Sequence, residues 1–186
     1  MKRFNSLLGA ASLFLALCTL TPVSAFSQEN QLNRIKLTWD SYAEVKDSKR
    51  PYIAYTAHQT THKYRATQKG TQLSLKFMVG VALDRKQSVV DFSRLSALDE
   101  EAKKNLLNHE QGHSDLAVLY GRILYKNLSK RLYSIKNYQQ EVKKVYDDTM
   151  KELGEIHFRY DMETAHGEEK ELQDKWDLYF KKELKG

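Results

Sequence analysis

The first half of the chain alternates polar and apolar residues. The alternation is clearest in Arg34–Trp39, Tyr52–Ala57, Gln72–Val81 and Ser88–Val90, which are rich in β-branched and aromatic side chains. A period of two places successive side chains on opposite faces of a strand, so these stretches predict three or four half-buried strands. The predicted strands follow one another without a helical pattern between them, which favours a small, mostly antiparallel sheet.

Near residue 95 the pattern changes to helical spacing. Ser96 and Asp99 have the spacing of a capping box, and an apolar stripe follows them as far as Leu124. A second helix is expected over residues 138–156 and a last one over 168–184, with a break between them at Tyr160–Gly167. The predicted fold class is therefore α+β: a small, mostly antiparallel sheet from residues 33–91 packed against two or three helices.

The first of these helices contains His109-Glu110-Gln111-Gly112-His113, an H-E-x-x-H motif. Residues four apart lie on the same helical face, so both imidazoles can reach one ion, and Zn²⁺ binds such nitrogens well. Glu110 projects about 100° around the helix from His109, where it can meet a metal-bound water without ligating the metal. The competing interpretation is a pair of core histidines, but two buried imidazoles without a metal would each need a hydrogen-bond partner.

A catalytic zinc site needs a third protein ligand and leaves one position for water. The candidates lie in the predicted break between the last two helices. His166 is the first choice, because Gly167 after it allows a tight turn beside the metal. Asp161 is the runner-up, either as a ligand or as a carboxylate that orients a ligating histidine, and Glu163 is third. The competing interpretation gives His166 and Asp161 only helix-capping roles.

Tyr160 is a candidate catalytic residue, because its hydroxyl can donate to the oxyanion that develops when water attacks a carbonyl. A tyrosine at this position fits the core equally well. The other histidines carry no comparable signal. His58 and His62 follow an extended stretch and would stand roughly 13 Å apart along a strand, and His157 is interpreted as structural.

The first 25 residues have the features of a cleaved export signal. Lys2 and Arg3 precede the uncharged apolar stretch Leu7–Leu20, and Val23-Ser24-Ala25 has the pattern of a cleavage site. The apolar stretch is shorter than the about 20 residues that a membrane span requires, so we expect no stable membrane insertion after cleavage. Residues 26–186 would then form a single domain, located in the periplasm or secreted.

Charge and cysteine content argue against two classes of function, nucleic-acid binding and chemistry that depends on a cysteine. The formal net charge of +6 falls to about +4 without Lys2 and Arg3, and the remaining cations often pair with acids at helical spacing. Nucleic-acid binding would need a basic cluster interleaved with aromatic residues, and the sequence has none. Cys18 is the only cysteine and leaves with the signal, so the mature chain has no thiol to act as a nucleophile or metal ligand.

The motif and its surroundings resemble the bacterial domain of unknown function 922 family. The residues that carry the likeness are Leu37–Tyr42, His109–Asp115, Tyr160–Gly167, Gln173 and Trp176. Members of that family are described as predicted zinc-dependent proteases, usually exported. The resemblance implies a zincin-like domain with zinc ligands His109 and His113, the base Glu110, and a third ligand within Tyr160–Gly167. Ser114 departs from the aromatic residue expected there, which should affect packing and not ligation.

The resulting hypothesis is an exported zinc metallopeptidase that acts on a peptide or protein substrate. Zinc would polarise the scissile carbonyl and activate a water, and Glu110 would take the water's proton and deliver it to the leaving amine. The strand near Phe77–Val81 is a candidate edge for an extended peptide. Two alternatives stay open. One is a non-catalytic zinc-binding envelope or scaffold protein whose site is closed by Asp161, Glu163 and His166; the other is a cell-wall amidase with the same chemistry.

Overall fold

The computed structural model describes residues 32–46 and 49–185. The export signal expected at residues 1–25 lies outside the described residues. The elements, in chain order, are η1 (Trp39–Ser41), β1 (Ala43–Glu44), β2 (Ala54–Tyr55), β3 (His58–Lys69), β4 (Gln72–Leu83), β5 (Val89–Val90), α1 (Phe92–Ser96), α2 (Glu100–Lys130), α3 (Tyr138–Thr164), η2 (Ala165–Gly167) and α4 (Lys170–Glu183). Within the described residues, no helix combines the length and the apolar character that crossing a bilayer requires.

The strands form two sheets. β3 and β4 make a long antiparallel hairpin, in which His58 pairs with Leu83 and Lys69 with Gln72. In the second sheet, β5 lies between β1, which it pairs in parallel, and β2, which it pairs antiparallel. A turn after Asp84, whose carbonyl accepts from the amide of Ser88 at 2.7 Å, separates β4 from β5 and divides the sheets. The expected α+β class with mostly antiparallel pairing is confirmed.

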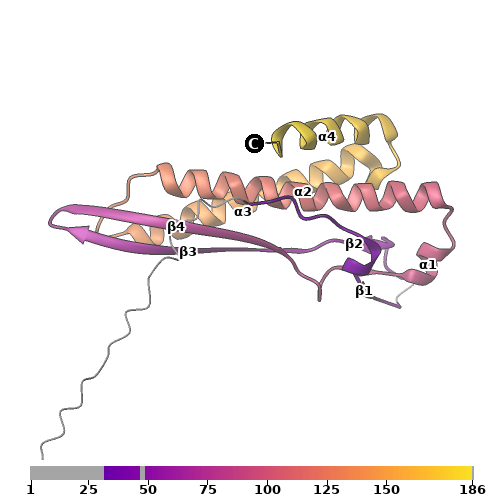
Figure 1. The fold of residues 1–186 in the computed structure, drawn as a ribbon, viewed down its shortest axis with the longest axis horizontal. Coiled ribbons are helices and arrows are strands. Elements are labelled where there is room, and N and C mark those ends of the chain that lie inside the picture. The colour runs from indigo at the N-terminus through magenta and orange to yellow at the C-terminus, as the bar shows by residue number, and fades with distance from the viewer. Residues whose placement is uncertain (1–31, 47–48, 186) are drawn as a thin grey trace, which may run out of the picture.

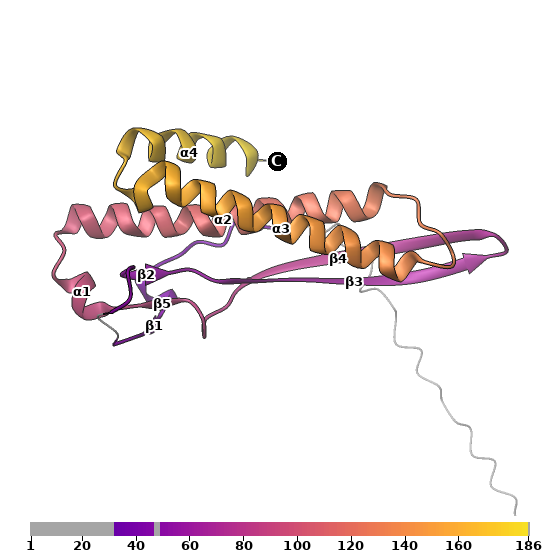
Figure 2. The same ribbon diagram turned by 180° about the vertical axis from the view of Figure 1, so that it is seen from behind.

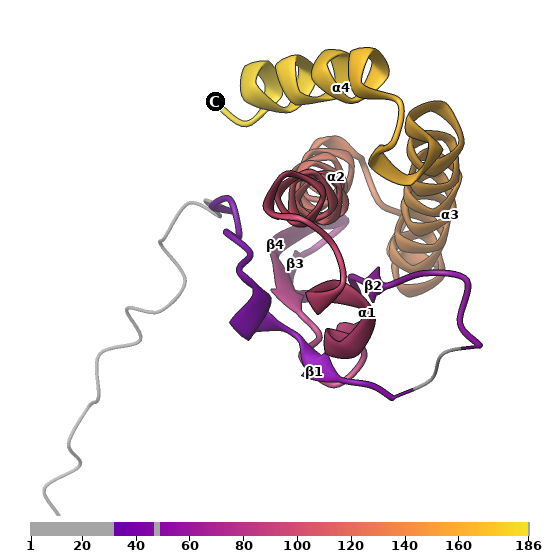
Figure 3. The same cartoon turned by 90° about the vertical axis from the view of Figure 1, so that its right-hand side faces the viewer.

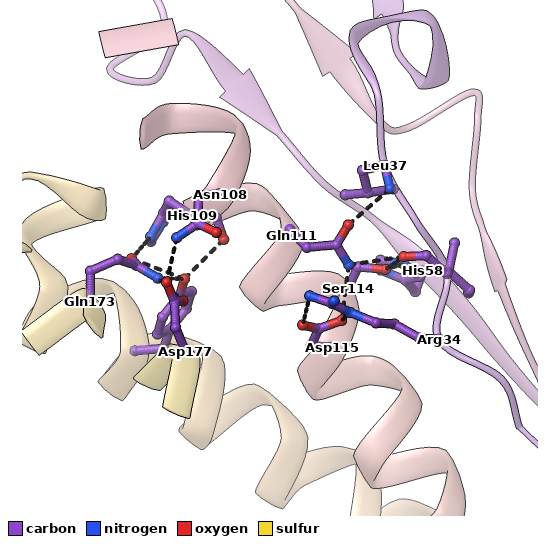
Figure 4. Close-up of polar contacts among 12 residues, drawn as sticks. Arg34, Leu37, His58, Asn108, His109, Gln111, Ser114, Asp115, Gln173 and Asp177 are labelled. Carbon is purple, nitrogen blue, oxygen red and sulfur yellow. Dashed lines mark hydrogen bonds and ion pairs between the residues drawn. The ribbon is translucent and has the colours of Figure 1, made fainter. Parts of the chain in front are cut away.

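One predicted strand is absent from the described residues: Arg34–Thr38 belongs to neither sheet, and Trp39 begins the 3-10 helix η1. Its backbone is held instead by a side chain of α2, because Gln111 accepts from the amide of Leu37 and donates to the carbonyl of Ile35, each at 2.9 Å. Arg34 adds a two-pronged ion pair to the buried carboxylate of Asp115, at 2.8 and 2.7 Å (Figure 4). A side-chain amide can form the hydrogen bonds of a backbone segment as a neighbouring strand does. A period-two pattern therefore does not show whether the segment is paired with a strand or with a side chain.

The helices lie in layers on the strands. Figure 1 shows α2 running along the hairpin and α4 on the far side of α2, away from the strands. Figure 2 shows α3 packed beside α2 in the opposite direction, and Figure 3 shows the same layers end-on. One core cluster lies between the hairpin, α2 and α3, and consists of Phe77, Val79, Leu124, Leu128, Val142 and Val145. Another joins α2, α3 and α4 through Leu116, Leu119, Tyr160 and Phe180.

α3 is longer than the sequence pattern predicts. It continues past residue 156 to Thr164 and ends where Ala165 and His166 adopt left-handed backbone angles, with φ of 45° and 56°. The expected break at Tyr160 is therefore wrong: Tyr160 and Asp161 are helical, and the chain turns only after them. Burial of Tyr160 against α2 supplies the packing energy that extends the helix beyond its apolar pattern, since helices in proteins are stabilised mainly by packing.

Candidate metal centre

The two motif histidines lie on one inward face of α2, as the helical spacing predicts. His109 is 2% and His113 12% exposed, and their ring centroids are 4.9 Å apart. Gly112 between them is required for the approach of α3, because a Cβ at this position would lie 2.1 Å from the hydroxyl oxygen of Tyr160. The motif glycine thus brings α3 close enough for its side chains to reach the histidines.

Asp161 of α3 meets both imidazoles. Its Oδ1 lies 3.1 Å from Nε2 of His109 and 2.9 Å from Nε2 of His113. Burial alone would raise the pKa of Asp161, but the hydrogen bonds from His109 and His113, together with their charge, lower that pKa below its usual range. The three side chains offer ligand atoms that all lie within 4.8 Å of one another, so this group could hold a metal ion.

The structure brings the runner-up Asp161, and not the first choice His166, into this group. Nδ1 of His166 is 3.6 Å from Oδ1 of Asp161, and the His166 side chain is 73% exposed. The difference follows from the length of α3, since Asp161 sits one helical turn before the end and faces α2, whereas His166 follows the left-handed turn. Glu163 faces the other way and accepts a hydrogen bond from the Trp176 indole at 2.9 Å.

Gly167 holds the turn beside His109, as its position after His166 suggested. Its φ is +93°, and a Cβ there would lie 2.9 Å from Cβ of His109. A side chain at this position would therefore be strained by its backbone and blocked by the His109 side chain.

Tyr160 lies beneath the metal group and has no exposed surface. Its hydroxyl donates to the carbonyl of His109 at 3.0 Å and accepts from Nε2 of Gln173 at 2.8 Å. Its ring stacks on the imidazole of His109, with centroids 4.7 Å apart. The structure thus places Tyr160 where it supports His109, a candidate ligand, with the Tyr160 hydroxyl already hydrogen-bonded within the protein.

A buried polar network from α3 and α4 surrounds the other face of His109. Nδ1 of His109 lies 3.3 Å from Oγ1 of Thr164 and 3.4 Å from Oε1 of Gln173, so either oxygen can accept its proton. Gln173 donates to Asp177, which also accepts from Asn108, both at 2.8 Å (Figure 4). Such partners fix the imidazole so that Nε2 presents its lone pair to an ion.

His113 is held by a second histidine that the sequence interpretation treated as structural. Nδ1 of His113 lies 2.8 Å from Nδ1 of His157. Burial lowers the pKa of His157 to about 3, and the nearby imidazoles of His113 and His58 lower it further, so His157 is neutral and can accept from His113. The available signal was the spacing of His157 and Asp161, which are four apart and share a helical face once α3 is extended.

His58 and Ser114 form a further contact beside the motif. Nε2 of His58 lies 3.0 Å from Oγ of Ser114, and Ser114 donates to the carbonyl of Ile35 at 3.2 Å. Burial lowers the pKa of His58 to about 4, and the charge of His113 adds to the effect. Ser114 is therefore hydrogen-bonded to the side chain of the first residue of β3.

Glu110 is held by a relay that the sequence did not reveal. Oγ1 of Thr56 donates to Oε2 of Glu110 at 2.5 Å, and the hydroxyl of Tyr42 lies 2.7 Å from the same Oγ1. Since Thr56 has one hydroxyl proton, Tyr42 must be the donor in the second bond. Burial raises the pKa of Tyr42, and the charge of Glu110 reinforces the shift, so the phenol keeps that proton.

A cavity of about 840 Å³ opens over this group. Its lining includes His109, Glu110, His113 and Asp161, and it extends between residues 51–58 and the apolar face of α3 at Met150, Leu153 and Gly154. The candidate metal centre and the candidate base therefore share one accessible wall.

Comparison with known proteins gives a family but no characterised relative. Searches of curated proteins and of solved structures find no match. Residues 29–167 match the model of a family described as bacterial protein of unknown function (DUF922). This span is most of the chain and includes both motif histidines, Glu110 and Asp161, while α4 with Gln173 lies beyond it. The chain therefore belongs to the DUF922 family of bacterial proteins.

Proposed function

We propose that this protein is an exported zinc metallopeptidase that hydrolyses peptide bonds. The observation that carries the proposal is the convergence of His109, His113 and Asp161 on one cavity wall beside Glu110. Two imidazoles and one carboxylate are a donor set that catalytic zinc sites use, whereas oxygen-rich sets suit Mg²⁺ and Ca²⁺.

Two of the three distances between the candidate ligand atoms are close to those of a zinc site. With zinc–ligand bonds of about 2.0–2.1 Å, tetrahedral ligand atoms stand roughly 3.3 Å apart. The distances from Oδ1 of Asp161 to the two Nε2 atoms, 3.1 and 2.9 Å, are close to that spacing. Bound zinc would supply a Lewis acid that acidifies water and polarises a carbonyl.

Glu110 is proposed as the general base. Thr56 holds Oε2, and Oε1 has no protein donor among the described residues, so Oε1 can take a proton from the attacking water. The same carboxyl group then delivers that proton to the amine nitrogen that leaves. Because the Thr56 hydroxyl is itself fixed by Tyr42, the carboxylate enters the reaction already oriented.

The substrate edge proposed here is β2 and not the Phe77–Val81 strand that the sequence suggested. Phe77 and Val79 are buried in the core under α2 and α3, and no residue of 77–81 lines the cavity. β2 is the outer strand of its sheet and lines the cavity at Ala54 and Tyr55. An extended peptide can pair with such an edge through main-chain hydrogen bonds.

The substitution Glu110→Gln tests the proposal. Gln keeps an oxygen to accept from Thr56 but cannot take a proton, so the variant should bind one zinc per chain and lose hydrolysis of an unstructured peptide by at least 100-fold. Zinc is measured by elemental analysis after dialysis, and cleavage by mass spectrometry. Full cleavage by the Gln variant would remove Glu110 from the mechanism.

The second candidate function is a closed, non-catalytic zinc site. It is favoured by one distance, the 3.6 Å between Nδ1 of His166 and Oδ1 of Asp161, which would let a small rotation add His166 as a fourth ligand. The absorption spectrum of the cobalt-substituted protein separates a four-ligand site from three ligands plus water. His166→Ala should leave the spectrum unchanged for a catalytic site and change it for a closed one.

A further inference from the structure

Residues 54–58 border the cavity, and they begin a single extended segment that continues through β3 to residue 69. β2 and β3 are consecutive along it, with β5 and β4 paired on the other side. The carbonyl of Ile53 accepts from Asp91, and that of Ala57 accepts from Asp84, both at 2.9 Å. Backbone groups of successive residues alternate between the two sides of an antiparallel strand. The N–H and C=O groups of the even-numbered residues from 54 to 60 therefore face away from β4 and β5.

These even-numbered residues meet the cavity at one end and α3 at the other. Ala54, Thr56 and His58 line the cavity, whereas Thr60 does not. The carbonyl of Thr60 instead accepts a hydrogen bond from the hydroxyl of Tyr146 on α3, at 3.0 Å. The Tyr146 ring also packs on His62, with centroids 4.9 Å apart. Tyr146 thus occupies the next backbone acceptor that a peptide paired along this edge would use.

We propose that the contact between Tyr146 and Thr60 closes one end of the cleft, so that the protein trims short fragments from the amino ends of extended peptides. This inference rests on the proposed hydrolase function and defines its substrate class. Each cleavage consumes one water: its hydroxyl joins the new carboxyl end, and its proton joins the new amine.

The length of the fragment follows from the geometry. Glu110 is hydrogen-bonded to Thr56, so bond cleavage takes place beside Thr56. Thr60 lies four positions after Thr56, and a strand rises about 3.3 Å per residue, which leaves roughly 13 Å. That distance accommodates about four extended peptide residues between the cleaved bond and the closure.

The polarity of the fragment follows from the direction of the strand. The segment runs from Ala54 towards Thr60, and antiparallel pairing is the more stable arrangement per residue. A peptide paired antiparallel to it has its amino end at Tyr146. The released fragment is therefore amino-terminal.

A linear peptide and its head-to-tail cyclic form test the closure. The probe is an unstructured 20-residue peptide of the same sequence in both forms, incubated with the zinc-loaded full chain. We expect amino-terminal fragments of at most about four residues from the linear form, and at least tenfold slower cleavage of the cyclic form. Equal cleavage of both forms, internal cuts, or carboxyl-terminal fragments would overturn the proposal.

Tyr146→Ala should open the closed end, lengthen the fragments and allow the cyclic peptide to be cleaved. Tyr138→Ala is the matched control, because Tyr138 is also on α3 and contacts the hairpin at Tyr64, with ring centroids 6.1 Å apart, yet the hydrogen bond to the Thr60 carbonyl is made by Tyr146. The control should keep the fragment lengths of the unaltered protein. An unchanged fragment pattern in folded Tyr146→Ala would overturn the proposal.

Binding separates this inference from the proposed function. Fluorescence anisotropy with zinc-loaded Glu110→Gln should show the linear peptide binding at least tenfold more tightly than the cyclic form. If the unaltered protein cleaves no peptide but this preference is present, the hydrolase proposal fails and the closed cleft stands. If both forms bind equally, the closed cleft is refuted, whatever the turnover.

Discussion

Tyr160→Phe separates two roles for the Tyr160 hydroxyl, donation to a reacting oxyanion and support of His109. The hydroxyl is fully buried and makes contacts at 3.0 Å to the His109 carbonyl and 2.8 Å to Gln173. Removing it leaves buried polar groups with one partner fewer, which costs about 2 kcal/mol. For a domain of this size, that loss lowers Tm by about 4–8 °C. Zinc affinity should fall less than about tenfold, because the ring still packs on His109.

Urea unfolding and competition with a zinc chelator measure the two quantities. Tyr179→Phe is the control, since Tyr179 lies on α4 but is 43% exposed, and its substitution should change stability by less than about 0.5 kcal/mol. An oxyanion donor would instead show a loss of about 10²–10³ in kcat at unchanged stability. That second pattern would refute the supporting role and return Tyr160 to the reaction.

Three further substitutions probe the surroundings of the centre. His157→Phe removes the acceptor for His113 and should weaken zinc binding about 10–100-fold by chelator competition. The pKa of His58 is lowered to about 4, so the unfolded chain takes up its proton first as pH falls from 6.5 towards 4. In metal-free protein, the free energy of unfolding measured with urea should fall by up to about 3 kcal/mol over that pH range, and by less in His58→Gln. Ala165→Gly relieves the strain of a left-handed backbone and should raise the free energy of unfolding by about 1 kcal/mol. Ala102→Gly within α2 should lower it by a similar amount. Equal effects of the two substitutions would show that the backbone at Ala165 is not strained.

The motif helix and its inward face follow from the sequence alone. Helical spacing is a local property, so His109 and His113 had to share a face, and the apolar stripe around them had to turn that face to the core. Of the two hairpin strands, alternation predicted β4 through Gln72–Val81, whereas β3 was not predicted, because His58–Lys69 has few apolar side chains to mark an inward face. The α+β class followed from the order of these two patterns along the chain.

The third member of the metal group was decided by packing. The apolar pattern of α3 fades before Tyr160, and only contact with α2 at Gly112 continues the helix and turns Asp161 towards the histidines. His166 was preferred from the sequence because a loop was expected where the helix persists. The spacing of apolar residues within one helix does not predict how far that helix packs along another, because the length of the contact depends on the shapes of both surfaces.

The partners of the motif side chains were also set by the tertiary structure. Thr56 reaches Glu110 across 54 positions of sequence, and Gln173 reaches His109 across 64. The periodicity of the sequence does not predict such contacts, because neither Thr56 nor Gln173 departs from the pattern of the strand or helix in which it lies. The chain's pattern determined that two imidazoles and an acid would lie on one turn of helix; the approach of α3, α4 and β2 determined what surrounds them, because buried polar groups must find partners wherever the packed elements bring them.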